Sequence, residues 1–124
     1  MKKILVLGSN SFAGAVFVDE CLNANFNVVG VNRSPEQNPA FLPVKENPKL
    51  ADYEFHQMNI NDDQDALQSL ITDFKPNVIV DYAAQSMVAE SWDNPDQWYL
   101  TNIVAKAKLT KFLMKADYLD QFIR

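Results

Sequence analysis

The chain has 124 residues, a formal net charge of −5 and only three glycines. With 48% hydrophobic and 22% charged residues, it cannot be collagen-like, low-complexity or disordered, because those classes need glycine or proline repeats or a low apolar fraction. An acidic chain without a dense Lys/Arg cluster also argues against nucleic-acid binding. The length fits a single domain, residues 1–124.

The cellular compartment is suggested by one cysteine and by the N-terminal residues. Cys21 is alone and cannot form an intramolecular disulfide, which favours a reducing environment and a thiol that packs as a small apolar side chain. The first apolar run is interrupted at residues 8–11 and is too short for a signal peptide. No stretch of 18 apolar residues exists, so no transmembrane helix is expected. We expect a soluble, cytoplasmic protein without a membrane partner.

Hydrophobic patterns and turn residues divide the chain into alternating strands and helices. The last of the expected helices begins at Asn94 and Pro95 and has an apolar stripe of Leu100, Ile103, Val104, Ala107 and Leu113. Asp62 is the expected N-cap of the helix before it. In chain order we expect a strand at 4–7, a helix at 13–22, a strand at 27–31, a proline-rich loop at 32–50, a strand at 53–58, a helix from 62 to about 75, a strand at 78–80, a loop, a helix from 94 to about 116 and the start of a strand within 118–124.

These elements predict an α/β fold. Short strands that are apolar on both faces and alternate with helices form a parallel sheet covered by helices on both sides, here a Rossmann-like sheet of four to five strands. A sheet that ends at its fourth strand leaves an apolar edge, which is normally covered. We therefore expect self-association or a partner chain at that edge.

The motif with chemical meaning lies between the first strand and the first helix. The turn runs from Gly8 to Gly14 with Ser11 midway. A helix N-terminus offers free N–H groups and a partial positive charge, which suit a pyrophosphate. Gly8 permits the tight turn, and Gly14 permits close packing of helix on strand. The alternative is an ordinary strand-to-helix turn without a ligand.

Two segments together resemble a known family. The first is the turn at 8–14, in which Ser11 stands for the middle glycine of Gly-x-x-Gly-x-x-Gly. The second reads Asp-Tyr-Ala-Ala-Gln-Ser at 81–86 and Thr-Asn-Ile at 101–103, which is similar to His-x-Ala-Ala-Gln-Ser and Thr-Asn-Val. Both resemble the extended short-chain dehydrogenases/reductases, which include nucleotide-sugar epimerases and 4,6-dehydratases. The resemblance covers nearly the whole chain, and the GDP-mannose and dTDP-glucose 4,6-dehydratases look nearest.

The resemblance implies a bound dinucleotide and a role for each matching residue. Ala83, Ala84 and Gln85 would line the end of the fourth strand beside the ribose and nicotinamide, and Asn102 would hold the local backbone; an exposed helix position is the alternative for Asn102. The remaining implied positions are Gly8, Ser11, Phe12 and Gly14 under the pyrophosphate, and Asn59 and Ile60 beside the adenine, where Asn59 replaces the usual acid.

The residues at the end of the second strand indicate whether the dinucleotide is NAD or NADP. An NAD site places a carboxylate there to accept hydrogen bonds from the ribose 2′-hydroxyl. This chain has Asn32 and Arg33 followed by a serine, and no acid. The guanidinium of Arg33 can pair with a 2′-phosphate. We therefore expect NADP, with NAD less favoured; a solvated loop charge is the alternative for Arg33.

The catalytic pair of the resembled family is missing. That family uses Tyr-x-x-x-Lys, whereas the residues four positions after Tyr53, Tyr82, Tyr99 and Tyr118 are Gln, Ser, Ile and Phe. We therefore expect an N-terminal portion, truncated relative to the full family fold and inactive alone, with no catalytic residue and no metal site. The alternative is a stand-alone, non-catalytic dinucleotide-binding or protein-interaction module.

Overall fold

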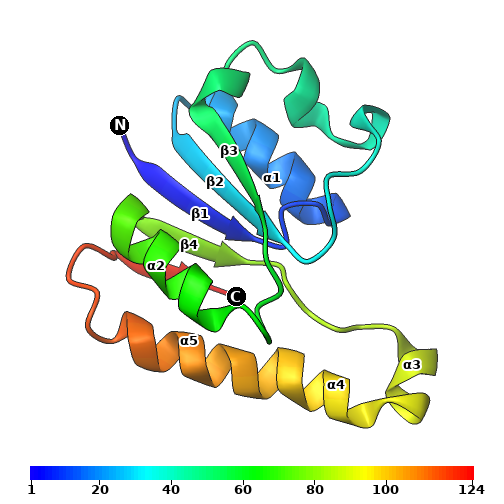
Figure 1. Ribbon diagram of the computed structural model, residues 1–124. Helices are drawn as coiled ribbons and strands as arrows, with labels where there is room; N and C mark the ends of the chain where they lie inside the picture. Colours follow the sequence, from blue (N-terminus) through cyan, green and yellow to red (C-terminus); the bar gives the residue numbers. More distant parts are fainter.

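The computed structural model describes all 124 residues and contains one parallel sheet with the strand order β3-β2-β1-β4-β5 (Figure 1). Every neighbouring pair is parallel, and Leu5 in the central strand pairs with Val29 and Ile79. The α/β fold and the Rossmann-like sheet are confirmed. The strands are β1 (Lys3–Leu7), β2 (Asn27–Asn32), β3 (Tyr53–Gln57), β4 (Val78–Asp81) and β5 (Gln121–Ile123).

Helices cover both faces of the sheet, as the sequence predicts (Figure 1). Alternate residues of a strand point to opposite faces. Ile4 and Val6 accordingly pack with α1, whereas Leu5 and Leu7 pack with α2 and α5. The helices are α1 (Phe12–Asn23), α2 (Gln64–Phe74), α3 (Val88–Asp93), α4 (Pro95–Tyr99) and α5 (Ala105–Leu113), with the π-helical turn η4 (Leu100–Val104) joining α4 to α5 and the short 3₁₀ turns η1 (Pro39–Phe41), η2 (Pro43–Glu46) and η3 (Leu50–Asp52) after β2.

The fifth strand changes the expected edge of the sheet. Ile79 of β4 pairs with Phe122 of β5, so β4 is an inner strand and the two edges are β3 and β5. The apolar edge that we expected at the fourth strand is therefore covered by the chain itself. A partner chain at the remaining edges stays a prediction.

The start of α2 differs from the prediction. The residue in the cap position is Asp63 rather than Asp62, and its side chain caps no helical N–H. Its Oδ2 instead accepts a hydrogen bond of 2.8 Å from the backbone N–H of Asn59, which ties the loop before the helix. The helix ends at Phe74, and its C-cap Lys75, immediately before Pro76, has a left-handed φ of 52°.

The apolar stripe predicted for the last helix is wrong except at Leu113, which is buried. Leu100, Ile103 and Val104 are exposed, and Ala107 is exposed as well. The extra residue of a π-helical turn shifts the helical face, and the buried face carries a lysine that an apolar pattern passes over. That face consists of Ala105, Lys106, Leu109 and Leu113.

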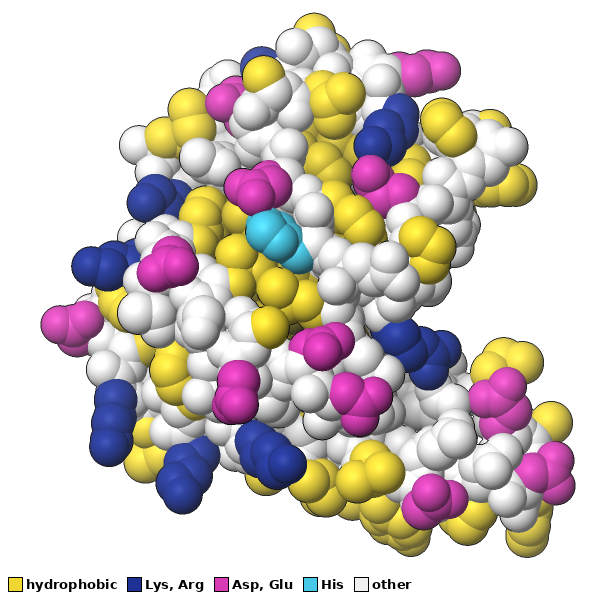
Figure 2. Space-filling model, in the orientation of Figure 1, with side chains coloured by type: hydrophobic (Ala, Val, Ile, Leu, Met, Phe, Trp, Pro, Cys, Tyr) yellow, Lys and Arg dark blue, Asp and Glu magenta, His cyan; other side chains and the backbone are white.

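Helix α3 was not predicted, because the segment after β4 reads as a loop. It projects at one end of the molecule (Figure 1), and its Trp92 is 83% exposed. Figure 2 shows hydrophobic side chains along the edge formed by α3 and α4. None of the helices is long and apolar enough to span a bilayer.

Cys21 lies buried in α1 against the sheet. Burial, with a contribution from the carboxylate of Glu20, raises the pKa of its thiol to about 11. A thiol with a raised pKa holds little of the nucleophilic thiolate. The predicted role as a small apolar side chain is confirmed.

Candidate functional site

A pocket of about 230 Å³ lies at the carboxyl ends of the strands. It straddles β1 and β4, where the strand order reverses, and this switch point is the usual ligand site of an open parallel sheet. Figure 2 shows the molecule hollowed between the segment that follows β2 and the helices α3 and α4. The lining residues are Gly8, Asn10, Ser11, Val31, Asn32, Arg33, Ser34, Gln37, Met58, Asn59, Ile60, Asn61, Tyr82, Ala83, Ala84, Gln85 and Thr101.

Arg33 is the one charged residue in this lining, which contains no carboxylate. The chain as a whole carries an excess of acids, so the absence of acids from the pocket is a local feature. Arg33 is exposed and forms no ion pair with any residue of the chain. Its guanidinium is free to pair with an anion entering the pocket.

The turn from β1 into α1 depends on two glycines. Gly8 has a φ of 79°, and a Cβ there would lie 2.8 Å from the backbone nitrogen of Ala83. A Cβ on Gly14 would overlap the carbonyl oxygen of Gly8. Gly8 therefore lets β1 and the end of β4 approach each other, and Gly14 lets α1 sit close on the turn. Gly14 does not line the pocket.

Ser11 works as the N-cap of α1. Its Oγ accepts a hydrogen bond of 3.0 Å from the N–H of Gly14 and donates one of 2.7 Å to the carbonyl of Gly8. Its φ of −66° suits any L residue, so this position does not require the glycine of the resembled motif. The backbone N–H groups of Phe12 and Ala13 donate to no group in the chain, whereas the side chain of Phe12 is 90% exposed and lies outside the pocket.

Asn10, whose role was not predicted from the sequence, joins the turn to the segment after β2. Its backbone N–H donates to Oδ1 of Asn32 at 3.2 Å, and its Nδ2 donates to the carbonyl of Pro35 at 3.0 Å. Asn32 in turn donates to Oγ of Ser34 at 3.1 Å. These contacts bring Asn32, Arg33 and Ser34 to the mouth of the pocket. A polar residue within the glycine turn is the signal that could have identified Asn10.

The loop after β3 forms the next part of the wall. Oδ1 of Asn59 accepts a hydrogen bond of 2.9 Å from the N–H of Asn61, and Asn61 donates to Oγ1 of Thr101 at 2.9 Å. Ile60 is buried among the core residues of the α2 and α5 side. The amide oxygen predicted to receive an exocyclic amine is thus already engaged once, and it keeps a second lone pair.

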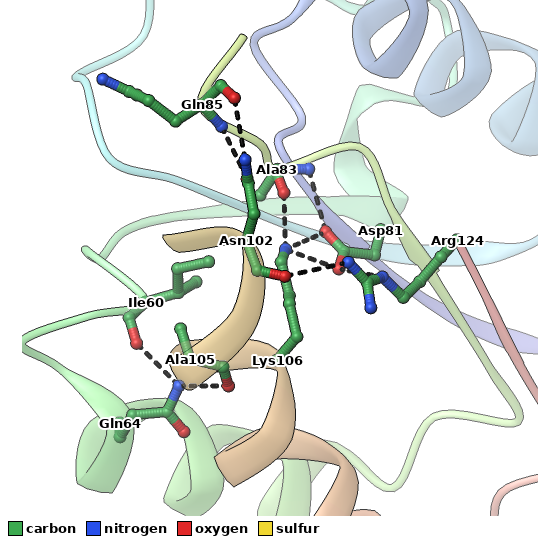
Figure 3. Close-up of polar contacts among 9 residues, drawn as sticks. All are labelled: Ile60, Gln64, Asp81, Ala83, Gln85, Asn102, Ala105, Lys106 and Arg124. Carbon is green, nitrogen blue, oxygen red and sulfur yellow. Dashed lines mark hydrogen bonds and ion pairs between the residues drawn. The ribbon is translucent and has the colours of Figure 1, made fainter. Parts of the chain in front are cut away.

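The last part of the wall is the segment Ala83–Gln85 after β4. Asn102 holds it through two hydrogen bonds of 2.9 Å each: its Oδ1 accepts from the backbone N–H of Gln85, and its Nδ2 donates to the carbonyl of the same residue (Figure 3). The geometry matches the backbone-holding role predicted for Asn102. Asn102 itself does not line the pocket.

Behind this segment lies a buried ion pair that was not predicted from the sequence (Figure 3). Nζ of Lys106 is 2.7 Å from Oδ1 and 2.6 Å from Oδ2 of Asp81, and their side chains are 3% and 1% exposed. Burial lowers the pKa of Lys106, while the hydrogen bond and charge of Asp81 oppose that shift. Nε of Arg124 lies 3.8 Å from Oδ2 of Asp81.

Comparison with protein families identifies the chain. Residues 5–122 match the family model described as GDP-mannose 4,6 dehydratase. The chain belongs to this family. The predicted resemblance to the nucleotide-sugar epimerases and dehydratases among the extended short-chain dehydrogenases/reductases is thereby confirmed.

Individual relatives agree with the family. A UDP-glucose 4-epimerase of Mycolicibacterium smegmatis is 32% identical over 109 residues, which are 88% of this chain and 34% of the relative. Among solved structures, the UDP-Glc/GlcNAc 4-epimerase of Campylobacter jejuni superposes with a TM-score of 0.81 at 20% identity, over 98% of this chain and 36% of that one. A dTDP-glucose 4,6-dehydratase of Bacillus anthracis, solved in complex with NAD, gives 0.75 at 22% identity, over 98% and 36%. The chain spans about a third of the length of these relatives.

Proposed function

We propose that this chain binds NADP(H) and forms the dinucleotide-binding part of a nucleotide-sugar epimerase or dehydratase. The observation that carries the proposal is the composition of the pocket at the switch point, where an arginine is the one charged side chain and no carboxylate is present. A dinucleotide carries a pyrophosphate, so such a lining favours it and penalises a cation. The family membership supports the same class of ligand.

The start of α1 supplies the pyrophosphate-binding part of this proposal. The backbone N–H groups of Phe12 and Ala13 lack an acceptor in the chain and lie at the positive end of a helix of 12 residues. Gly8 lines the same pocket, and its left-handed φ of 79° forms the turn that leads into this helix. The residues therefore fit a pyrophosphate through backbone donors, while the hydroxyl of Ser11 is used to hold the turn.

The preference for NADP over NAD rests on the end of β2. Asn32, Arg33 and Ser34 line the pocket there, and no acid is available to accept hydrogen bonds from a free ribose 2′-hydroxyl. A 2′-phosphate would gain charge-assisted hydrogen bonds from Arg33. Several structural neighbours were solved with NAD, so the preference must be decided by measurement on this chain.

When bound, a nicotinamide supplies reversible acceptance and release of hydride. The residues of this chain would bind and orient the dinucleotide: the start of α1 at the pyrophosphate, the loop at Asn59 and Ile60 at the adenine, and Ala83–Gln85 at the ribose and nicotinamide. No tyrosine in these 124 residues has a lysine four positions later. We therefore assign binding, and no proton transfer, to this chain.

The absence of a Tyr-x-x-x-Lys pair also favours a second candidate, a non-catalytic dinucleotide-binding module. The two candidates differ in whether further catalytic residues act on the dinucleotide held here. Both candidates predict that this chain alone does not convert a nucleotide sugar. The test is to incubate the chain with nucleotide sugars and NADP and to follow the nicotinamide absorbance and the sugar products. Turnover by this chain alone would contradict both.

Thermal unfolding and calorimetric titration test the proposed binding. A ligand at about 100 times its Kd adds about 2.7 kcal/mol to the free energy of unfolding, so NADP should raise the melting temperature clearly. The expected order of affinity is NADP above NAD. Tighter binding of NAD would refute the preference, and no stabilisation by either nucleotide would refute the function.

A further inference from the structure

The wall segment Ala83–Gln85 is held in an unusual way. Its backbone forms no hydrogen bond with the backbone of any strand or helix. Instead, the carboxylate of Asp81 accepts a hydrogen bond of 2.9 Å from the backbone N–H of Ala83, and Lys106 donates one to the backbone carbonyl of Ala83. The side chain of Asn102 bonds both the backbone N–H and the backbone carbonyl of Gln85. Three side chains therefore replace the ladder that ends with β4, and two of them form the buried ion pair (Figure 3).

A buried ion pair is a costly way to hold a fold together. Desolvating both charges offsets most of their attraction, and an apolar pair of similar volume is often as stable. Lys106 and Asp81 do not line the pocket, so neither is placed to touch a ligand. The pair instead fixes the orientation of the wall segment. Nζ of Lys106 contacts both carboxylate oxygens of Asp81 and the carbonyl of Ala83 at the same time.

We propose that Lys106 and Asp81 are positioning residues, which fix the backbone of Ala83–Gln85 and thereby set the affinity of the pocket for the nicotinamide half of a dinucleotide. The proposal rests on the proposed function, because that half is assigned to this wall. It also implies a division of the pocket. The adenosine half meets the loops after β2 and β3, which the ion pair does not contact.

The position of the pair within the chain also suits a positioning role. Asp81 is the last residue of β4, and Lys106 is the second residue of α5, directly after the π-helical turn that carries Asn102. Nη2 of Arg124 donates to the carbonyl of Asn102 at 3.4 Å and so connects the end of β5 to the same cluster. The strand, the helix and the wall segment thus meet at one set of charges.

The test compares variants by two measurements. Lys106→Met removes the donor, and the double variant Asp81→Asn/Lys106→Met removes both charges, so that no unpaired charge remains buried. Lys111→Met is the matched control, since it changes an exposed lysine of the same helix. The first measurement is hydrogen exchange of the Ala83 and Gln85 amides against that of Leu5 in the core. The second is the affinity for NADP and for 2′,5′-ADP, a probe of the adenosine half alone.

We expect the double variant, which keeps no unpaired buried charge, to speed exchange at Ala83 and Gln85 about tenfold while leaving Leu5 protected, because local opening is separate from global unfolding. The affinity for NADP should fall about tenfold and that for 2′,5′-ADP by less than about twofold. Equal losses for the two nucleotides, or equal loss of protection at Leu5, would show a general structural role and overturn the proposal. Unchanged exchange and affinity in the double variant would overturn it too.

The outcome remains decisive if a variant or the function fails. If Lys106→Met does not fold, the double variant decides. If the unaltered protein binds neither nucleotide, the proposed function is refuted, and positioning is then judged by amide exchange alone. Unchanged protection of Ala83 and Gln85 in that case would refute the positioning role as well.

Discussion

Nζ of Lys106 is 2.6 Å from Oδ2 of Asp81, and both side chains are almost fully buried. Replacing Lys106 by Met would leave the carboxylate buried without its partner. Arg124 is 3.8 Å away and 53% exposed, which is too distant and too solvated to take over. We expect Lys106→Met to lower the free energy of unfolding by about 3–5 kcal/mol, measured by urea denaturation. The exposed Lys111→Met should change it by less than about 0.5 kcal/mol, and an equal loss in both would contradict this reading.

Ser11 should be replaceable by glycine but not by alanine. Its Oγ caps the N–H of Gly14, and an N-cap serine changed to alanine costs about 1 kcal/mol, whereas a change to glycine costs a few tenths. Thermal unfolding of Ser11→Ala and Ser11→Gly measures the difference. Equal stability of the two variants would show that the cap contributes little.

Arg33 should separate the two dinucleotides. Hydrogen bonds to a charged group contribute about 1.5–3 kcal/mol, so Arg33→Gln should weaken NADP binding by roughly 30-fold. Binding of NAD, which lacks the 2′-phosphate, should hardly change. Isothermal titration of both nucleotides against both proteins measures the effect, with Lys111→Gln as the control for loss of one positive charge. A parallel loss for NAD would place Arg33 elsewhere on the ligand.

Tyr53 should make stability depend on alkaline pH. Burial raises the pKa of its phenol from 10.0 to about 12; the Ser9 hydroxyl lowers it, and the Glu36 carboxylate raises it further. Between these values the unfolded chain loses the proton while the folded chain keeps it. This contribution to stability is therefore complete below pH 10 and is lost as the pH rises towards 12.

The matched variant for this prediction is Tyr53→Phe. The difference in unfolding free energy between the two proteins should shrink over the range from pH 10 to 12, because the phenylalanine has no proton to lose. Cys21 is common to both and cancels. A spectrophotometric titration of the tyrosines should lose its latest-ionising component in the variant; a constant difference across that range would contradict the raised pKa.

The turn and the sheet were predictable because their signals are local. Gly8 and Gly14 are needed by backbone geometry at their own positions, and apolar runs such as residues 4–7 identify buried strands. Most of the predicted site residues do line one pocket. Phe12, Gly14 and Asn102 do not line it. Gly14 lets α1 sit close on the turn, Asn102 holds the backbone of Gln85 with its side chain, and the N–H of Phe12 has no acceptor in the chain.

The long helix was harder to predict for a physical reason. Helical periodicity assumes a constant 3.6 residues per turn and an apolar buried face. The turn at residues 100–104 breaks the first assumption, and Lys106 breaks the second. Lys106 can be buried only because it forms an ion pair with Asp81, which lies 25 positions earlier in the chain. A partner that distant cannot be deduced from spacing, and the same holds for the bond between Asn61 and Thr101.

The π-helical turn η4 makes the chain length between Pro95 and Lys106 critical. A π turn amounts to an α-helix with one residue added, and each residue of an α-helix advances by about 100° around the axis. Deleting one residue within 100–104 should relax the helix to regular winding. Either Asn102 or Lys106 would then rotate away from the end of β4, so this stretch should tolerate substitution far better than a change in length.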